Sequence, residues 1–102
     1  VLYENGLGVI RDYTEAAYWL RRAAEQGHAA AQNNLGVLYA NGQGVPRNPV
    51  LAYVWYSLAA AGDNAKARFN RDQIVREISS EQLAEGRRLA AEYVKRHRPV
   101  LP

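Results

Sequence analysis

The chain has 102 residues, of which 48% are hydrophobic and 23% charged, and it contains no Cys and no Met. This balance is typical of a single globular domain, and the absence of Cys excludes disulfides, thiolate metal ligands and a cysteine nucleophile. The net charge is +3, divided as −1 over residues 1–63 and +4 over residues 64–102, which is far from the dense basic surface of a nucleic-acid-binding protein.

An internal repeat of 36 residues covers the first part of the chain. When residues 1–24 are aligned with residues 37–60, twelve of the 24 pairs are identical, among them Trp19 with Trp55. Ala16, Trp19, Leu20 and Ala23 follow the i, i+3, i+4, i+7 spacing of one helix face. The second copy repeats this spacing, so the repeated unit is predicted to be a helix, a Gly-rich turn and a helix.

Each predicted helix has start and stop signals. Asp12 with Glu15, and Asn48 followed by Pro49, are typical of helix starts. Four glycines stand where helices are expected to end, and left-handed backbone is predicted there: Gly6, Gly27, Gly42 and Gly62. Gly8 and Gly44 are predicted to be turn glycines that recur with the repeat.

Stacked hairpins of this kind share one continuous core, because a single hairpin cannot bury its own apolar face. The predicted core residues are Trp19, Ala23, Leu35, Leu38, Tyr39, Trp55 and Ala59. Residues 1–5 are expected to be only the last turn of a first helix. We therefore expect the apolar face at this end to be covered by an upstream repeat of a longer protein, or by self-association with a second copy.

Residues 63–98 repeat less clearly and are predicted to form a closing helix pair. Ser79 and Gln82 have the spacing of a capping box before the last helix, whose outer face is polar. The predicted organisation is one domain over 1–98, with a first repeat at 1–27, a second at 28–62, a divergent capping pair at 63–98 and a tail at 99–102.

The stretch Leu38 to Val45, followed by Ala52, Trp55 and Ala59, resembles the Sel1-like repeat family, which is related to tetratricopeptide repeats. The resemblance implies an all-α, right-handed α-solenoid that serves as a non-catalytic scaffold or adaptor for protein binding. It also implies that the first helix of each hairpin lines a concave, peptide-binding face.

On the helix beginning near Ala29, the candidate groove residues are Gln32, Asn33, Asn34 and Val37. Asn34 matches the Asn that grips peptide backbone or a terminal carboxylate in many tetratricopeptide relatives. An amide both donates and accepts, which suits a peptide backbone. The alternative is that Asn34 hydrogen-bonds a neighbouring helix.

In the third hairpin, Arg68 and Arg71 are the candidates for binding an acidic partner, because a guanidinium matches a carboxylate in two parallel bonds. The alternative is that both are solvated charges beside Asp72 and Glu77. Phe69 or Asn70 stands where the motif Asn would fall, which departs from the family pattern.

No catalytic constellation is found. The two His residues, His28 and His97, have no ligand spacing, so no metal and no cofactor are expected. No stretch is long and apolar enough for membrane insertion, and a nucleic-acid partner is not expected. A small-molecule or cell-wall-fragment binding protein, or an enzyme of the envelope, remains the alternative to the scaffold.

Overall fold

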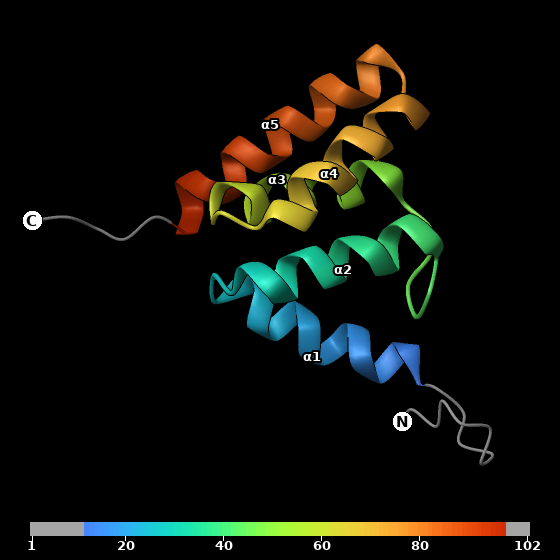
Figure 1. Ribbon diagram of the computed structural model, residues 1–102, viewed down its shortest axis with the longest axis vertical. Coiled ribbons are helices and arrows are strands. Elements are labelled where there is room, and N and C mark those ends of the chain that lie inside the picture. Colours follow the sequence, from blue (N-terminus) through green and yellow to red (C-terminus); the bar gives the residue numbers. More distant parts are fainter. Residues whose placement is uncertain (1–11, 98–102) are drawn as a thin grey trace, which may run out of the picture.

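The computed structural model describes residues 12–97, and these form a stack of helices (Figure 1). The elements are α1 (Tyr13–Glu25), α2 (Ala29–Asn41), α3 (Pro49–Ala61), α4 (Ala65–Ile74), the short 3-10 helix η1 (Val75–Glu77) and α5 (Ser80–His97). The described residues contain no strand, and the predicted all-α solenoid is confirmed. Gly6, Gly8 and the expected last turn at residues 1–5 lie outside the described residues.

Side-chain caps explain where the helices begin. Asp12 Oδ1 accepts a hydrogen bond from the backbone N of Glu15 at 3.0 Å, and Asn48 Oδ1 accepts one from the backbone N of Leu51 at 3.1 Å. Ser79 and Gln82 form both bonds of the predicted capping box, at 2.9 and 3.0 Å. Such caps satisfy backbone N–H groups that have no partner within the first turn of a helix.

The turns depend on glycine at two well-defined positions. Gly42 ends α2 with φ 68°, and Gly44 has φ 76°. A Cβ on Gly44 would lie 2.1 Å from the carbonyl oxygen of Tyr13, so the turn passes directly over the start of α1. The prediction for Gly62 is wrong, because its φ is −91° and the left-handed residue is Asp63, with φ 67°. Asp is one of the few residues other than Gly that tolerate this conformation.

Helix α3 is the centre of the core, since it packs against α2, α4 and α5. Glycines allow its aromatic side chains to approach the neighbouring helices closely. A Cβ on Gly36 of α2 would lie 2.6 Å from the ring of Tyr56, and one on Gly86 of α5 would lie 2.7 Å from the ring of Tyr53. Burial, followed by the charge of Glu77, raises the pKa of the Tyr56 hydroxyl.

Most residues of the predicted core are inside the molecule. The buried ones are Leu35, Leu38, Tyr39, Trp55 and Ala59, and Ala23 is half-buried against them. Trp19 contradicts the prediction, because 57% of it is exposed. It stands on α1, at the end of the described stack, and its ring packs edge-on against neighbouring Tyr18, with centroids 5.0 Å apart.

No helix within residues 12–97 combines the length and the apolarity needed to cross a membrane.

Candidate binding face

Helix α2 leaves one stripe of residues uncovered by its neighbours. Ala30, Asn34 and Asn41 are exposed, and Val37 is half-buried and packs in part against the core. Their spacing of i, i+4, i+7, i+11 places them on one side of the helix. The remaining sides of α2 pack mainly against α1 and α3. Because α2 also touches α4, the stripe borders the next hairpin along the stack, and α2 and α4 present a common face (Figure 1).

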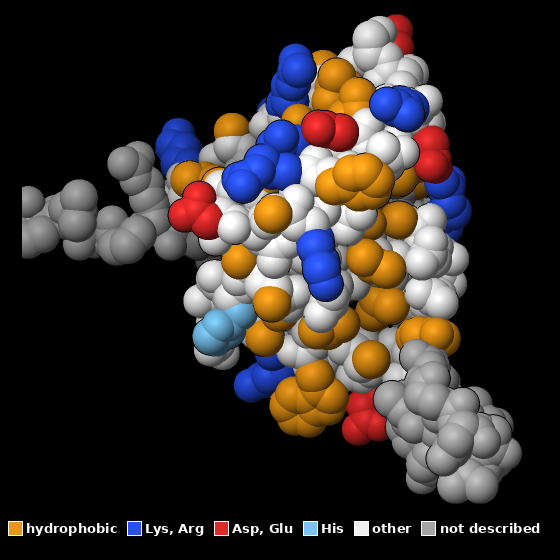
Figure 2. Space-filling view, in the orientation of Figure 1, with side chains coloured by type: hydrophobic (Ala, Val, Ile, Leu, Met, Phe, Trp, Pro, Cys, Tyr) orange, Lys and Arg blue, Asp and Glu red, His pale blue; other side chains and the backbone are white. Residues whose placement is uncertain are grey.

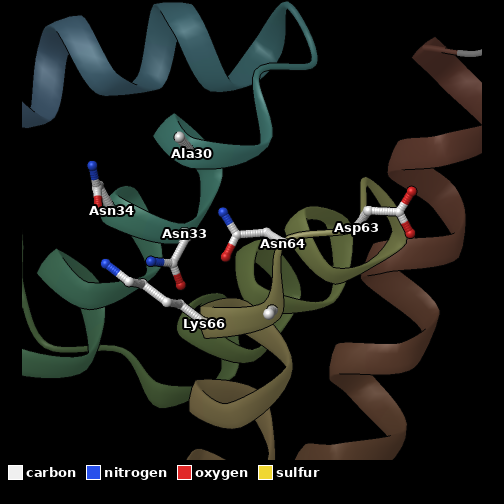
Figure 3. Close-up of a pocket in the computed structure, with 7 residues that line it drawn as sticks. Ala30, Asn33, Asn34, Asp63, Asn64 and Lys66 are labelled. Carbon is white, nitrogen blue, oxygen red and sulfur yellow. The ribbon is translucent and has the colours of Figure 1, made fainter.

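An open pocket of about 410 Å³ lies on this face, where the N-terminal ends of α2 and α4 meet. Its lining residues are Ala30, Asn33, Asn34, Asp63, Asn64, Ala65 and Lys66. The side chains of Asn33, Asn64 and Lys66 converge in Figure 3, with Asn34 beside them, whereas the carboxylate of Asp63 points away. We call these seven residues the α2–α4 pocket.

Hydrogen-bond donors are in excess in the α2–α4 pocket. Asn64 Oδ1 accepts from the backbone N of Ala67 at 2.9 Å, and Asn33 Oδ1 accepts from Asn70 Nδ2 at 2.9 Å. Both amide oxygens therefore accept hydrogen bonds within the protein. The groups left to face a ligand are the two amide NH₂ groups and the ammonium of Lys66, all of which are donors. The pocket is therefore suited to a ligand that supplies acceptors.

The structure separates the four residues predicted on α2. Gln32 is buried and its Nε2 donates to the carbonyl oxygen of Ala24 at 3.0 Å, so its prediction as a groove or solvent residue is wrong. Its amide satisfies a carbonyl near the end of α1 instead. Asn33 is also buried, yet it lines the pocket, as does the exposed Asn34. The bond to a neighbouring helix, considered above for Asn34, is made by Asn33.

Arg68 and Arg71 do not line the α2–α4 pocket. Arg68 precedes Asn70 by two positions, about 200° of helix rotation, and Asn70 faces α2. Arg68 therefore points to the opposite side of α4. Arg71 is half-buried, and its Nε lies 3.7 Å from a carboxylate oxygen of Asp72, which agrees with the alternative of a paired surface charge.

Asp63 and Asn64 line the pocket but are not among the residues predicted from the sequence. The run Gly62-Asp63-Asn64 before Ala65 is a helix-start signal of the same kind as Asn48 before Pro49. It would have predicted a turn followed by an Asn cap, and hence polar side chains at the first turn of α4. It would not have predicted that this end of α4 meets α2.

The titratable side chains that line the α2–α4 pocket are Asp63 and Lys66. The lining contains no hydroxyl or imidazole, and the described residues include no cluster of three or more side chains able to hold a metal ion. The groups with a shifted pKa lie outside the pocket: the hydrogen bonds that Arg88 of α5 donates to Glu85 chiefly raise the pKa of Arg88, and burial chiefly raises the pKa of Tyr93.

Stacked helix hairpins that present their first helices along one face define a helical-repeat scaffold. The model of the Sel1 repeat matches residues 1–28 and 29–64, and the chain therefore belongs to the Sel1 repeat family. Sel1 repeats generally mediate protein interactions and are typically non-catalytic. The comparison with curated proteins finds no match.

Two solved structures share this arrangement. The first is c5321, a protective antigen present in uropathogenic Escherichia coli strains and displaying an SLR fold, with 37% identity and a TM-score of 0.83 over 91% of this chain. The second is a Sel1 repeat protein from Oxalobacter formigenes, with 40% identity and a TM-score of 0.64 over 90% of this chain. The chain spans 20% of the first protein's length and 40% of the second's.

Proposed function

We propose that this chain is a non-catalytic scaffold that binds a peptide or protein segment along the face shared by α2 and α4. The observation that carries the proposal is the continuity of the uncovered α2 stripe with the α2–α4 pocket. Ala30 and Asn34 belong to both, and Val37 and Asn41 extend the stripe along the same side of α2.

The composition of this face supports a peptide better than a compact ligand. Extended backbone presents alternating N–H and C=O groups, and the amide of Asn34 can pair with either kind. The alternative, a small-molecule or cell-wall-fragment binding protein or an envelope enzyme, calls for a mostly apolar cavity that encloses its ligand. The α2–α4 pocket is open and does not enclose a ligand.

The test uses a displayed library of random peptides, from which binders are selected and then measured by fluorescence polarisation. We expect Asn34→Ala to weaken their binding about tenfold, because the substitution removes a hydrogen-bonding group that contacts the peptide directly. Gln26→Ala is the matched control, because Gln26 is an exposed amide outside both the stripe and the pocket.

Backbone amide shifts in NMR spectra locate the bound peptide. The proposal predicts that the shifts concentrate on α2 and the start of α4. It is wrong if the library yields no binder, or if the binders shift neither helix and are indifferent to Asn34→Ala.

A further inference from the structure

We infer that the segment bound on the α2–α4 face is acidic, with the carboxylate of an Asp or Glu side chain in the α2–α4 pocket and a bulky apolar side chain against Phe69. The inference rests on the proposed function and names the chemistry of the partner. Three features of the structure support it: the donor excess, the charge of the face and the exposure of one aromatic ring.

The first feature is the set of donors without an acceptor. The oxygens of Asn33 and Asn64 are bound within the protein, and no described residue accepts from their NH₂ groups or from the ammonium of Lys66. A carboxylate is acceptor-only when ionised, and its two oxygens offer about four lone-pair sites. Hydrogen bonds from a cationic donor to a carboxylate are also roughly twice as strong as neutral ones.

The second feature is the charge of the two helices. Helix α2 contains no Asp, Glu, Lys or Arg, and the cation that α4 contributes to the α2–α4 pocket is Lys66. The carboxylate of Asp63 points away from the pocket (Figure 3). Figure 2 shows Lys and Arg side chains, interspersed with Asp and Glu, on the side of the molecule that presents α2 and α4. An acidic segment therefore approaches a complementary surface.

The third feature is Phe69, which is 63% exposed, whereas Ala67 and Ile74 of the same helix are buried in the core. It follows Lys66 by three positions, and residues with this spacing are neighbours on a helix surface, about 5–6 Å apart at Cβ. An apolar side chain of the partner that covers this ring removes apolar area from water, which is favourable. The face thus offers a polar pocket and an apolar contact side by side.

Together these features set the spacing of the partner's residues. Side chains on the same side of an extended peptide are two residues apart, about 7 Å. This is about 1–2 Å more than the Cβ separation of Lys66 and Phe69, a difference that the long Lys66 side chain can bridge, so the acid and the apolar residue are expected at positions i and i+2. Because the pocket is open, the peptide chain can continue beyond it in both directions. We therefore assign the bound carboxylate to an Asp or Glu side chain and not to the C-terminus of the peptide.

The experiment compares three pools of octapeptides that are acetylated at the N-terminus and amidated at the C-terminus. One pool has Asp or Glu two residues from Leu or Phe, the second has Lys or Arg in place of the acid, and the third has Ser in place of the apolar residue. Amidation removes the terminal carboxylate. Affinity is measured by calorimetry, and the site is located by the NMR shifts of α2 and α4.

Two variants and two matched controls accompany the pools. Lys66→Glu is paired with Lys95→Glu, which makes the same charge change on an exposed residue of α5. Phe69→Ser is paired with Val94→Ser, because Val94 is also a large exposed hydrophobic residue of α5, at 50%. All four positions are exposed, so the variants are expected to keep the fold.

We expect the acidic pool with an apolar residue to bind best. Lys66→Glu should weaken its binding about tenfold or more, and Phe69→Ser about threefold, while both controls leave it unchanged. If the basic pool binds the same helices equally well, the inference of an acidic partner is wrong, but the proposed scaffold function is still supported. The inference is also wrong if the peptides bind only when their C-terminal amide is replaced by a free carboxylate, because the pocket would then recognise a chain end and not a side chain. If no pool shifts α2 or α4, the proposed function fails as well.

Discussion

Two tryptophans one repeat apart occupy very different environments. Trp55 of α3 is 7% exposed, and its ring packs edge-on against Tyr93 of α5, with centroids 5.2 Å apart. Trp19 holds the same place on α1, yet it is 57% exposed. Its ring contacts are local to α1, with Tyr18 at 5.0 Å and the guanidinium carbon of Arg22 at 5.9 Å from the ring centroid.

The difference shows that burial in this fold depends on the neighbouring helix. The two residues have the same identity and the same helical phase, and the burial of Trp55 depends on α5, which brings Tyr93 against its ring. A stack of repeats has such interfaces only between neighbours, so stability is the sum of repeat and interface terms. The contribution of each tryptophan is therefore expected to differ, although their local sequences agree.

The largest effect is expected for Trp55→Ala. Removing this buried ring leaves a cavity beside Tyr93 and should lower the free energy of unfolding by about 3–5 kcal/mol. Urea denaturation followed by circular dichroism measures the change. A loss below about 1 kcal/mol would mean that Trp55 is not a core residue in solution.

An intermediate effect is expected for Gly36→Ala, which tests the α2–α3 contact beside the same core. The new Cβ would lie 2.6 Å from the Tyr56 ring, and such overpacking costs typically about 1–3 kcal/mol, only partly offset by the better helix propensity of Ala. The same urea measurement applies. Asn34→Ala on the exposed side of α2 is the control and should be neutral; equal stability of both variants would contradict the close packing of these helices.

The smallest effect is expected for Trp19→Ala, within about 0.5 kcal/mol, since an exposed side chain removes little surface from water. Unfolding is measured at two protein concentrations. A loss close to that of Trp55→Ala, present only at the higher concentration, would show that a second copy covers this face. Coverage of this face by a second copy or an upstream repeat stays a prediction until then.

The sequence contained enough information for the fold. The match of Trp19 with Trp55 at a 36-residue shift, together with caps such as Asn48, specifies helices and turns through local chemistry. Trp19 was misplaced because periodicity identifies an apolar face and says nothing about which helix covers it. Gly62 was misassigned for a related reason, since Asp63 adopts the left-handed conformation one residue later.

Fewer of the pocket residues could be predicted from the sequence. Asn34 was singled out and lines the pocket, but Gln32 and Asn33 have the same kind of side chain and are buried. Which of three adjacent amides faces inward depends on the rotation of α2 against α1 and α4. The choice of Lys66 over Arg68 likewise depends on the rotation of α4, which is fixed by tertiary packing around Ala67 and Ile74.

Gly44 has a consequence for the curvature of the whole stack. Its turn crosses the backbone of Tyr13 at a distance that leaves no room for a Cβ, so the backbone itself sets how closely successive repeats approach on that side. Any larger residue would act as a wedge between the turn and α1 and would tilt one repeat against the next. A longer array built from this unit would then follow a superhelix of different pitch, and its inner face would be wider or narrower without any change in the residues that line it.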